Sequence, residues 1–343
     1  MRQTVKDGGG KWRLWRLGSR PSPTFTILHN LHFVSLVAFL ATACQSQTRG
    51  SGGGAGNRGG GAAGQFDGQR AFSYIQDQMG FGPRIPGTRG HDQTGDWLLA
   101  RLRERADTVI VQDIDHRLRN GTTLHLRNFL ARFRPSAGER VLYLAHWDTR
   151  PTSDQARTPA DRRRPVPGAN DGASGVAVLL GVADALKTKP SSVGVDLLFV
   201  DGEDFGDFAD TNDVLIGARW FSTHPPAGYP PLLAVLFDMV GDSGLRIPVE
   251  QNSLAGAPEV VEHVWRAAEE LGYGNVFVRT PGPILTDDHV ALQRAGIHAI
   301  DVVDFDYGPG NSYWHTPDDT IDKVSARSLQ TVGDVALAVI RSF

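Results

Sequence analysis

The chain has 343 residues, 40% apolar and 21% charged, which is sufficient for one large α/β domain with a full hydrophobic core. Its net charge of −3 argues against nucleic acid as a partner, and we interpret the densest basic cluster, Arg162-Arg163-Arg164, as a solvated loop. A single cysteine, Cys44, excludes an intrachain disulfide and a cysteine-based zinc site, so any metal must be bound by His, Asp and Glu.

The first 44 residues have the pattern of an export signal. Basic residues between Lys6 and Arg20 precede an apolar stretch whose uninterrupted part, Phe33 to Ala43, is shorter than the about 20 residues that a spanning helix needs. Small residues precede Cys44, which resembles the signal of a bacterial lipoprotein, where the cysteine carries the lipid. An ordinary secretory signal and a membrane anchor are the alternatives. We expect an exported protein, either periplasmic or attached to a membrane through a lipid on Cys44.

Residues 45–65 are dominated by Gly, Ser, Ala and Arg. Such a composition cannot bury apolar surface, and it predicts a flexible tether. The folded domain is therefore expected to comprise residues 66–343.

Within this domain the apolar spacing predicts helices and strands in alternation. Helical spacing occurs over residues 69–79, 90–105, 173–187, 257–271, 288–295 and 325–341. Two strand-like runs, 108–115 and 123–133, flank Asn120-Gly121, a strong hairpin signal. Four nearly continuous apolar runs are typical of strands covered on both faces of an α/β sheet: Val141–Ala145, Val195–Val200, Leu232–Val240 and Ile297–Val303.

Polar side chains follow each of these four runs. Ligands of open α/β sheets bind at the carboxyl ends of the strands, so these side chains are expected to converge. Together with the Gly168–Gly175 segment, which opens a helix, they supply His146, Asp171, Asp204, Asp238 and His315. Each signal alone has an ordinary explanation, such as a surface His–Asp pair or an aspartate that caps a turn. Their conjunction favours a site for zinc, since burying three carboxylates without a cation is strongly unfavourable.

These motifs also resemble a known family. The octapeptide Gly168–Gly175, together with His146-Trp147-Asp148, Glu203-Asp204 and His315, resembles the zinc aminopeptidases of peptidase family 28. The segments His146–Pro151, Asp238–Gly241, Thr286–His289 and Trp314–Thr316 are similar to its glutaminyl cyclase branch. The similarity extends over residues 70–343. It implies a three-layer αβα sandwich with a central mixed, mostly parallel sheet, as in zinc exopeptidases.

The resemblance also implies roles for individual residues. Asp171, Asp204 and His315 would hold one zinc, and Glu203 would shuttle protons. Asp238 and Asp287 would bind the substrate amine, while Trp314, Trp147 and Phe205 would line the substrate pocket. His289 is expected to orient Asp287. In aminopeptidase relatives, His146 and Asp238 would hold a second zinc with Asp171 as the bridge.

Two reactions fit this set of residues. A cyclase would use one zinc to polarise the side-chain amide of an N-terminal glutamine while the α-amine attacks it, and ammonia would leave. An aminopeptidase would use two zincs to activate a water that cleaves the first peptide bond. Asp287, Asp288, His289 and Trp314 favour the cyclase, so peptide or protein N-termini are the expected partners. A non-catalytic binding module is the remaining alternative, although such a module would be expected to have lost ligands.

Overall fold

The computed structural model describes residues 4–6, 12–14 and 64–343, which belong to two units, Met1–Asn57 and Arg58–Phe343. In the first unit, β1 (Thr4–Lys6) and β2 (Trp12–Leu14) form an antiparallel pair. The predicted lipidation site at Cys44 and all but residues 64 and 65 of the predicted tether lie outside the described residues. Among the described residues, no helix combines the length and apolarity that crossing a bilayer requires.

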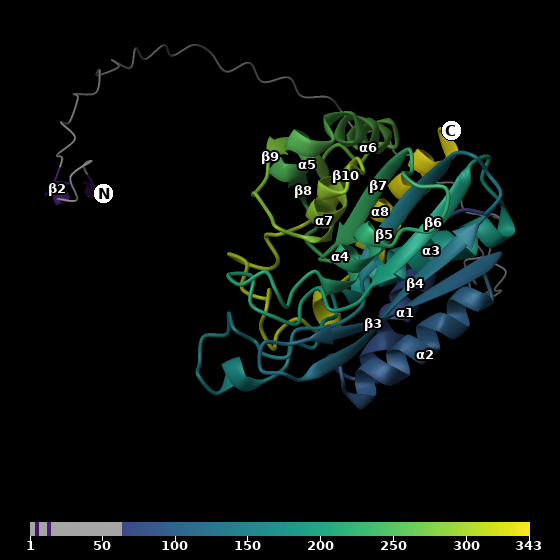
Figure 1. Ribbon diagram of the computed structural model, residues 1–343. Helices are drawn as coiled ribbons and strands as arrows, with labels where there is room; N and C mark the ends of the chain where they lie inside the picture. Colours follow the sequence, from purple (N-terminus) through teal and green to yellow (C-terminus); the bar gives the residue numbers. More distant parts are fainter. Residues whose placement is uncertain (1–3, 7–11, 15–63) are drawn as a thin grey trace, which may run out of the picture. The chain divides into compact units, whose positions relative to one another are not determined.

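A six-stranded sheet forms the centre of the second unit, in the order β10-β7-β5-β6-β4-β3 (Figure 1). The strands β10, β7, β5 and β6 pair in parallel, whereas β6–β4 and β4–β3 are antiparallel pairs. The predicted mixed, mostly parallel sheet is therefore confirmed. The strands are β3 (Thr108–Arg117), β4 (Thr123–Phe133), β5 (Arg140–His146), β6 (Gly194–Val200), β7 (Leu233–Asp238) and β10 (Ala299–Val303).

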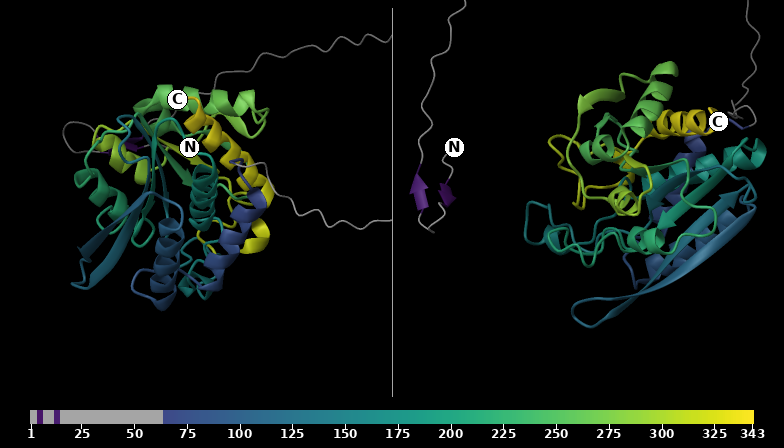
Figure 2. Two further views of the ribbon diagram at one scale, coloured as in Figure 1. Left: turned by 90° about the vertical axis from the view of Figure 1, so that its right-hand side faces the viewer. Right: turned by 45° about the horizontal axis from the view of Figure 1, so that its top comes forward.

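Helices cover both faces of this sheet, which confirms the three-layer sandwich. Alternate residues of a strand point to opposite faces, so Tyr143 packs into one core cluster with α1, α3 and α8, while Leu142 and Leu144 pack into the other with α4 and α7. Figure 2 shows α1 and α8 side by side on the first face. The bounds are α1 (Gly68–Gly80), α2 (Arg89–Arg103), α3 (Ala173–Thr188), α4 (Ile216–Thr223), α7 (Asp288–Arg294) and α8 (Ala326–Arg341).

Local signals set several of these boundaries. The side chain of Ser325 accepts a hydrogen bond from the backbone N–H of Ser328 and caps α8, as predicted. Gly121 has a positive φ of +88° in the β3–β4 connection, a conformation that glycine adopts without strain. The long loops that follow β5, β6 and β10 gather at one end of the sheet (Figure 1).

Short elements were not predicted from the sequence, because they are too short to show a periodic pattern. They include α4 and a small parallel sheet of β8 with β9. The others are α5 and two 3-10 turns. The longer helix α6, which follows α5 in the chain, was predicted over residues 257–271 and has nearly these bounds. Their bounds are β8 (Ile247–Val249), α5 (Gln251–Gly256), α6 (Pro258–Glu270), β9 (Phe277–Pro281), η1 (Asp161–Arg163) and η2 (Ile321–Lys323).

Gly175 in α3 provides a test of how tightly this helix packs on the sheet. A Cβ atom at this position would overlap the carbonyl oxygen of Phe237 at the end of β7. We expect Gly175→Ala to lower the free energy of unfolding by about 1–3 kcal/mol, because overpacking displaces the backbone. Thermal denaturation followed by circular dichroism measures the effect. Gly80→Ala in α1 is the matched control, since a Cβ there meets nothing within 4 Å; equal melting temperatures for the two variants would contradict the prediction.

Candidate metal centre

Three buried side chains from separate loops meet at the carboxyl end of the sheet. Asp171 precedes α3, Asp204 follows β6, and His315 lies in the loop after β10. One ligand atom from each lies within 4.8 Å of the others. His315 Nε2 is 3.6 Å from Asp171 Oδ2 and 3.4 Å from Asp204 Oδ1. The structure thus brings together the three residues that the sequence analysis assigned to one zinc.

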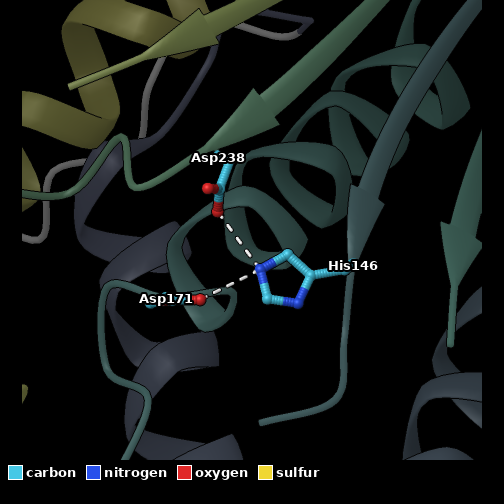
Figure 3. A group of neighbouring side chains, drawn as sticks. All are labelled: His146, Asp171 and Asp238. Carbon is cyan, nitrogen blue, oxygen red and sulfur yellow. Dashed lines mark hydrogen bonds and ion pairs between the residues drawn. The ribbon is translucent and has the colours of Figure 1, made fainter. Parts of the chain in front are cut away.

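A second group shares Asp171 with the first. His146 ends β5 and Asp238 ends β7, and their ligand atoms also lie within 4.8 Å of a carboxylate oxygen of Asp171. The Nε2 atom of His146 points between the two carboxylates, 3.1 Å from Asp171 Oδ1 and 3.2 Å from Asp238 Oδ1 (Figure 3). The two strands β5 and β7 are parallel neighbours, which places both residues at the same edge.

Asp319 accepts hydrogen bonds from the backbone at Asp171. One oxygen of Asp319 accepts the backbone N–H of Asn170 at 2.8 Å and the hydroxyl of Tyr307 at 2.8 Å. The other oxygen accepts the backbone N–H of Asp171 at 3.2 Å. Asp319 is fully buried, so these bonds are shielded from water and fix the backbone that carries the shared ligand.

Arg84 connects this loop to the end of β5. Its guanidinium is fully buried and donates to the carbonyl oxygens of Trp147 at 3.0 Å and Gly168 at 2.6 Å. The carbonyl of Pro167 accepts a third bond at 3.3 Å. Because a guanidinium is planar and rigid, it holds the two ligand-bearing segments at a fixed separation.

Glycine is required where these segments touch. A Cβ atom on Gly172 would overlap the imidazole of His146. Gly172 begins the turn into α3 directly after Asp171. The absence of a side chain therefore allows the shared carboxylate and the histidine to approach each other.

The Glu203–Asp204 pair is positioned by Asp148. The two oxygens of Asp148 accept the backbone N–H groups of Glu203 at 3.1 Å and Asp204 at 3.2 Å. Asp148 also lies 3.6 Å from Nδ1 of His146. The buried carboxylate of Asp148 thus positions the Glu203–Asp204 pair and lies beside His146.

Arg150 and Asp154 contact two of the candidate zinc ligands, Asp204 and His315. Arg150 Nη1 donates to Asp204 Oδ1 at 2.6 Å, and its Nε donates to Asp154 Oδ1 at 2.8 Å. Asp154 Oδ1 in turn lies 3.1 Å from Nδ1 of His315. A histidine whose other ring nitrogen bonds a carboxylate is the usual arrangement of a metal ligand, because this contact fixes the tautomer and the ring orientation.

The electrostatics of the site favour a bound cation. Burial raises the pKa of Asp204 to about 7 and that of Glu203 well above its usual value. Burial also acts to raise the pKa of Asp171, but the hydrogen bond and charge of His146 outweigh it and lower that pKa. The Oδ2 atom of Asp204 is buried and has no hydrogen-bond partner in the described part of the chain. An unpartnered buried carboxylate oxygen beside a histidine and a second carboxylate fits a divalent metal ligand.

A cavity of about 380 Å³ opens beside these ligands. Glu203, Asp238 and Asp287 form its acidic floor, and all three are less than 9% exposed. Apolar side chains line another part of it, together with polar residues that include Arg150, Asp154 and Asp207; the apolar residues are Phe208, Ile284, Leu285, Phe305 and Trp314. Apolar side chains beside convergent carboxylates are suited to a small cationic or amine-bearing group.

Asp287 is the N-cap of α7, and its Oδ1 accepts the backbone N–H of Asp288 at 2.5 Å. Burial and the charge of Asp238 raise the pKa of Asp287 to about 7. Neither a hydrogen bond nor an ion pair joins His289 to Asp287; its Nε2 lies 3.3 Å from Glu250 and its Nδ1 lies 4.0 Å from Asp301. His289 therefore lies next to Glu250 and does not make the predicted polar contact with Asp287.

Two predicted pocket residues lie elsewhere. Trp147 is fully buried, stacks on His91 with ring centroids 4.2 Å apart and donates from Nε1 to the carbonyl of Arg127. Since His146 points toward the metal centre, its neighbour is directed to the opposite side and into the core. Phe205 packs against a small apolar cluster that contains Ile216. Phe208, and not the predicted Phe205, lines the cavity.

Several residues of the site were not identified from the sequence. Arg84 and Asp319 act through backbone contacts, which leave no spacing pattern. Asp154 and Phe208 lie in irregular loops, where neither periodicity nor a motif marks them. The nearest available signal was the position of Asp319 four residues after His315.

Comparison with known proteins agrees with this geometry. Residues 128–340 match the model of peptidase family M28. A solved glutaminyl cyclase of Porphyromonas gingivalis is 38% identical, with a TM-score of 0.77 over 81% of this chain and 98% of that one. A solved zinc-dependent exopeptidase of Parabacteroides distasonis is 35% identical, with a TM-score of 0.78 over 82% of this chain and 100% of that one.

A curated relative comes from the peptidase side of the family. An aminopeptidase of Bacillus subtilis is 30% identical over 209 residues, which cover 58% of this chain and 40% of that protein. The chain thus spans less than half of that aminopeptidase. Because the family match contains both groups of candidate ligands, from His146 to His315, the chain belongs to peptidase family M28.

Proposed function

We propose that the protein is a glutaminyl-peptide cyclotransferase, which converts an N-terminal glutamine of a peptide to pyroglutamate and releases ammonia. The observation that carries this proposal is the position of Asp238 and Asp287 together in the cavity that also contains Asp171, Asp204 and His315. A cyclase uses one zinc, whereas the aminopeptidase alternative uses two. The two reactions therefore differ in whether Asp238 binds the substrate amine or a second zinc.

The group of Asp171, Asp204 and His315 has the spacing of an open site. Ligand atoms at about 2.0–2.1 Å from a tetrahedral zinc are separated from one another by about 3.3 Å. The distances from His315 Nε2 are 3.4 and 3.6 Å, and no direct hydrogen bond joins His315 to either carboxylate. In the other group, His146 Nε2 makes a direct hydrogen bond to Asp238. The distances of His146 Nε2 from Asp171 and Asp238, 3.1 and 3.2 Å, are as near to the zinc spacing as those of His315, so the residues of both groups suit an ion.

With one zinc on Asp171, Asp204 and His315, Asp238 would remain available to the substrate. Together with Asp287 it lines the cavity, and both carboxylates can accept hydrogen bonds from the α-amine of the peptide. Trp314 and Phe305, whose rings pack edge to face at 4.8 Å, form the apolar wall against which the glutamine side chain would lie. These contacts would bring the amine and the side-chain amide into one small space, which would favour an intramolecular attack.

Glu203 is the residue that would move the proton. When the zinc is bound it polarises the side-chain amide of the substrate as a Lewis acid. The α-amine nitrogen forms the new bond to the amide carbon, and Glu203 accepts a proton from this amine. Glu203 then donates the proton to the amide nitrogen, the old C–N bond breaks and ammonia leaves. A buried carboxyl whose pKa is raised is suited to both halves of this transfer.

The second candidate is a two-zinc aminopeptidase. It is supported by the complete group of His146, Asp171 and Asp238 and by the similarity to the Bacillus subtilis enzyme. In that reaction Glu203 would take a proton from water, and the first peptide bond would be cleaved. The same residues thus serve either reaction, and the nucleophile distinguishes them.

We also propose that the protein is exported and attached to a membrane through a lipid on Cys44. The support is the order of basic start, short apolar run and small residues before the cysteine. Its partners would be the N-termini of peptides or proteins outside the cytoplasm.

A comparison of two substrates tests the proposed reaction. The zinc-loaded protein is incubated with a Gln-initiated peptide and with a Leu-initiated peptide of the same sequence beyond the first residue. We expect ammonia and a pyroglutamyl peptide from the first and no reaction of the second, because leucine has no side-chain amide. Ammonia assay and mass spectrometry measure the products. Release of free leucine would instead identify an aminopeptidase.

Replacement of Glu203 tests its role. We expect Glu203→Gln to lower kcat by about 10²–10⁴-fold, since glutamine has the same shape but cannot carry the proton. Zinc content and melting temperature should not change. Glu262→Gln, at an exposed position in α6, is the control for the loss of one acidic charge. A Glu203→Gln variant close to the wild-type rate would show that another group moves the proton.

Zinc content separates the two ligand groups. We expect one zinc per chain in the purified protein, almost none in His315→Ala, and one zinc retained in His146→Ala, because a cyclase would hold its zinc on Asp171, Asp204 and His315. Elemental analysis after dialysis measures the content, and circular dichroism shows that the variants are folded. Two zincs in the wild type with one lost in His146→Ala would support the aminopeptidase.

A further inference from the structure

A second cavity, of about 690 Å³, adjoins the catalytic cavity. It lies between the segments 155–164 and 309–318, which follow β5 and β10. We propose that this cavity binds the residues that follow the N-terminal glutamine of the substrate and that Arg157 favours acidic side chains among them. The inference rests on the proposed function, because it assigns a substrate preference to the same site.

Two side chains border both cavities. Gln155 and Trp314 each line the cavity of the metal centre and the second cavity. The backbone N–H of Gln155 donates to the carbonyl of His315 at 3.3 Å, and the Trp314 ring stacks on the His315 ring at 3.9 Å. A peptide whose first residue contacts the metal centre would therefore cross this shared border to reach the larger space.

The catalytic cavity is more acidic than the second cavity, whose lining contains two arginines, Arg157 and Arg164, and two aspartates, Asp161 and Asp318. The catalytic cavity contains the buried carboxylates of Glu203, Asp238 and Asp287, which suit an amine. The segment 157–164 carries four arginines and one aspartate, Asp161, which pairs with Arg164 at 3.2 Å. Arg157 lines the second cavity and makes no ion pair among the described residues. An acidic side chain downstream of the glutamine would supply its missing partner.

Asp318 limits how strong this preference can be. It lies on the facing wall and is exposed, so it opposes a second acidic group without neutralising Arg157 directly. Exposed ion pairs contribute little, about 0.2–1 kcal/mol, which corresponds to a change in kcat/KM of about 1.4-fold to fivefold. The effect expected here is therefore a preference and not an absolute requirement.

The basic segment is held in place before any peptide binds. The backbone N–H of Ser153 donates to the carbonyl of Arg164 at 2.7 Å, and Val166 donates to the carbonyl of Arg150 at 3.1 Å. Arg162 Nε donates to the carbonyl of Ala156 at 2.8 Å. Because its ends and its middle are tied, the segment presents Arg157 with little loss of conformational freedom on binding.

Another cavity, of about 410 Å³, is a less suitable path. It shares only Phe305 with the catalytic cavity. It also contains Asp304 and Asp306, with Arg246 as its single cation. The border at Phe305 is smaller than the one that Gln155 and Trp314 form with the second cavity, so the path past Trp314 is favoured.

The test compares two peptides with the zinc-loaded protein, Gln-Ala-Glu-Glu-amide and Gln-Ala-Gln-Gln-amide. The neutral peptide has nearly the same shape, so the ratio of their kcat/KM values reports charge recognition. We expect the acidic peptide to be favoured about threefold to fivefold at low salt, with the ratio falling toward one at high ionic strength. Arg157→Ala should bring the ratio close to one, and Arg157→Lys should restore part of it. Arg163→Ala, which removes the same charge outside the cavity, should keep the wild-type ratio.

Each outcome decides between the two proposals. Cyclisation of both peptides with equal kcat/KM would overturn the subsite and leave the cyclase standing. Release of the first residue without cyclisation, but with the acidic preference, would overturn the cyclase and support the subsite. If neither peptide reacts, their dissociation constants are measured through tryptophan fluorescence, since Trp314 borders both cavities. Equal dissociation constants would then overturn the subsite, and tighter binding of the acidic peptide that Arg157→Ala abolishes would support it.

Discussion

The organisation of the site follows from one electrostatic constraint. Asp171, Glu203, Asp204, Asp238 and Asp287 are buried at one edge of the sheet, where each carboxylate raises the cost of ionising the next. A divalent cation would remove most of this cost, and His146 and His315 each belong to one of the two groups of candidate ligands. The surrounding structure holds these groups close to one another, at separations that suit a metal ion.

The scaffold achieves this with buried polar contacts to the backbone. Arg84, Asp148 and Asp319 each bond to main-chain groups of the segments that carry the ligands. Such bonds restrain the position of a loop independently of its side-chain rotamers, so the ligands are ordered before the ion binds. The parallel strands β5 and β7 add a rigid base, since His146 and Asp238 end adjacent strands.

The same arrangement separates two tasks in space. The acidic cavity is suited to an amine and to proton transfer by Glu203, whereas the arginine-bearing segment beyond Trp314 is suited to the rest of a peptide. Phe208, Phe305 and Trp314 form apolar walls between water and the carboxylates. An enzyme of this form would recognise the amino terminus by charge and the following residues by a weaker, screened interaction.

The sequence by itself determined the order of the main helices and strands, the sandwich around a mostly parallel sheet, and the loops from which Asp171, Asp204, Asp238 and His315 come. Apolar periodicity and turn residues act locally, so they can be read along the chain. Only the tertiary structure decided that Trp147 enters the core while Phe208 and not Phe205 reaches the cavity, that Arg84 and Asp319 hold the ligand segments, and that Arg157 faces a second cavity. The positions of Trp147, Phe205 and Phe208 depend on the direction in which the chain turns after a strand ends. The contacts of Arg84 and Asp319 join residues more than 50 positions apart, for which the sequence carries no periodic signal.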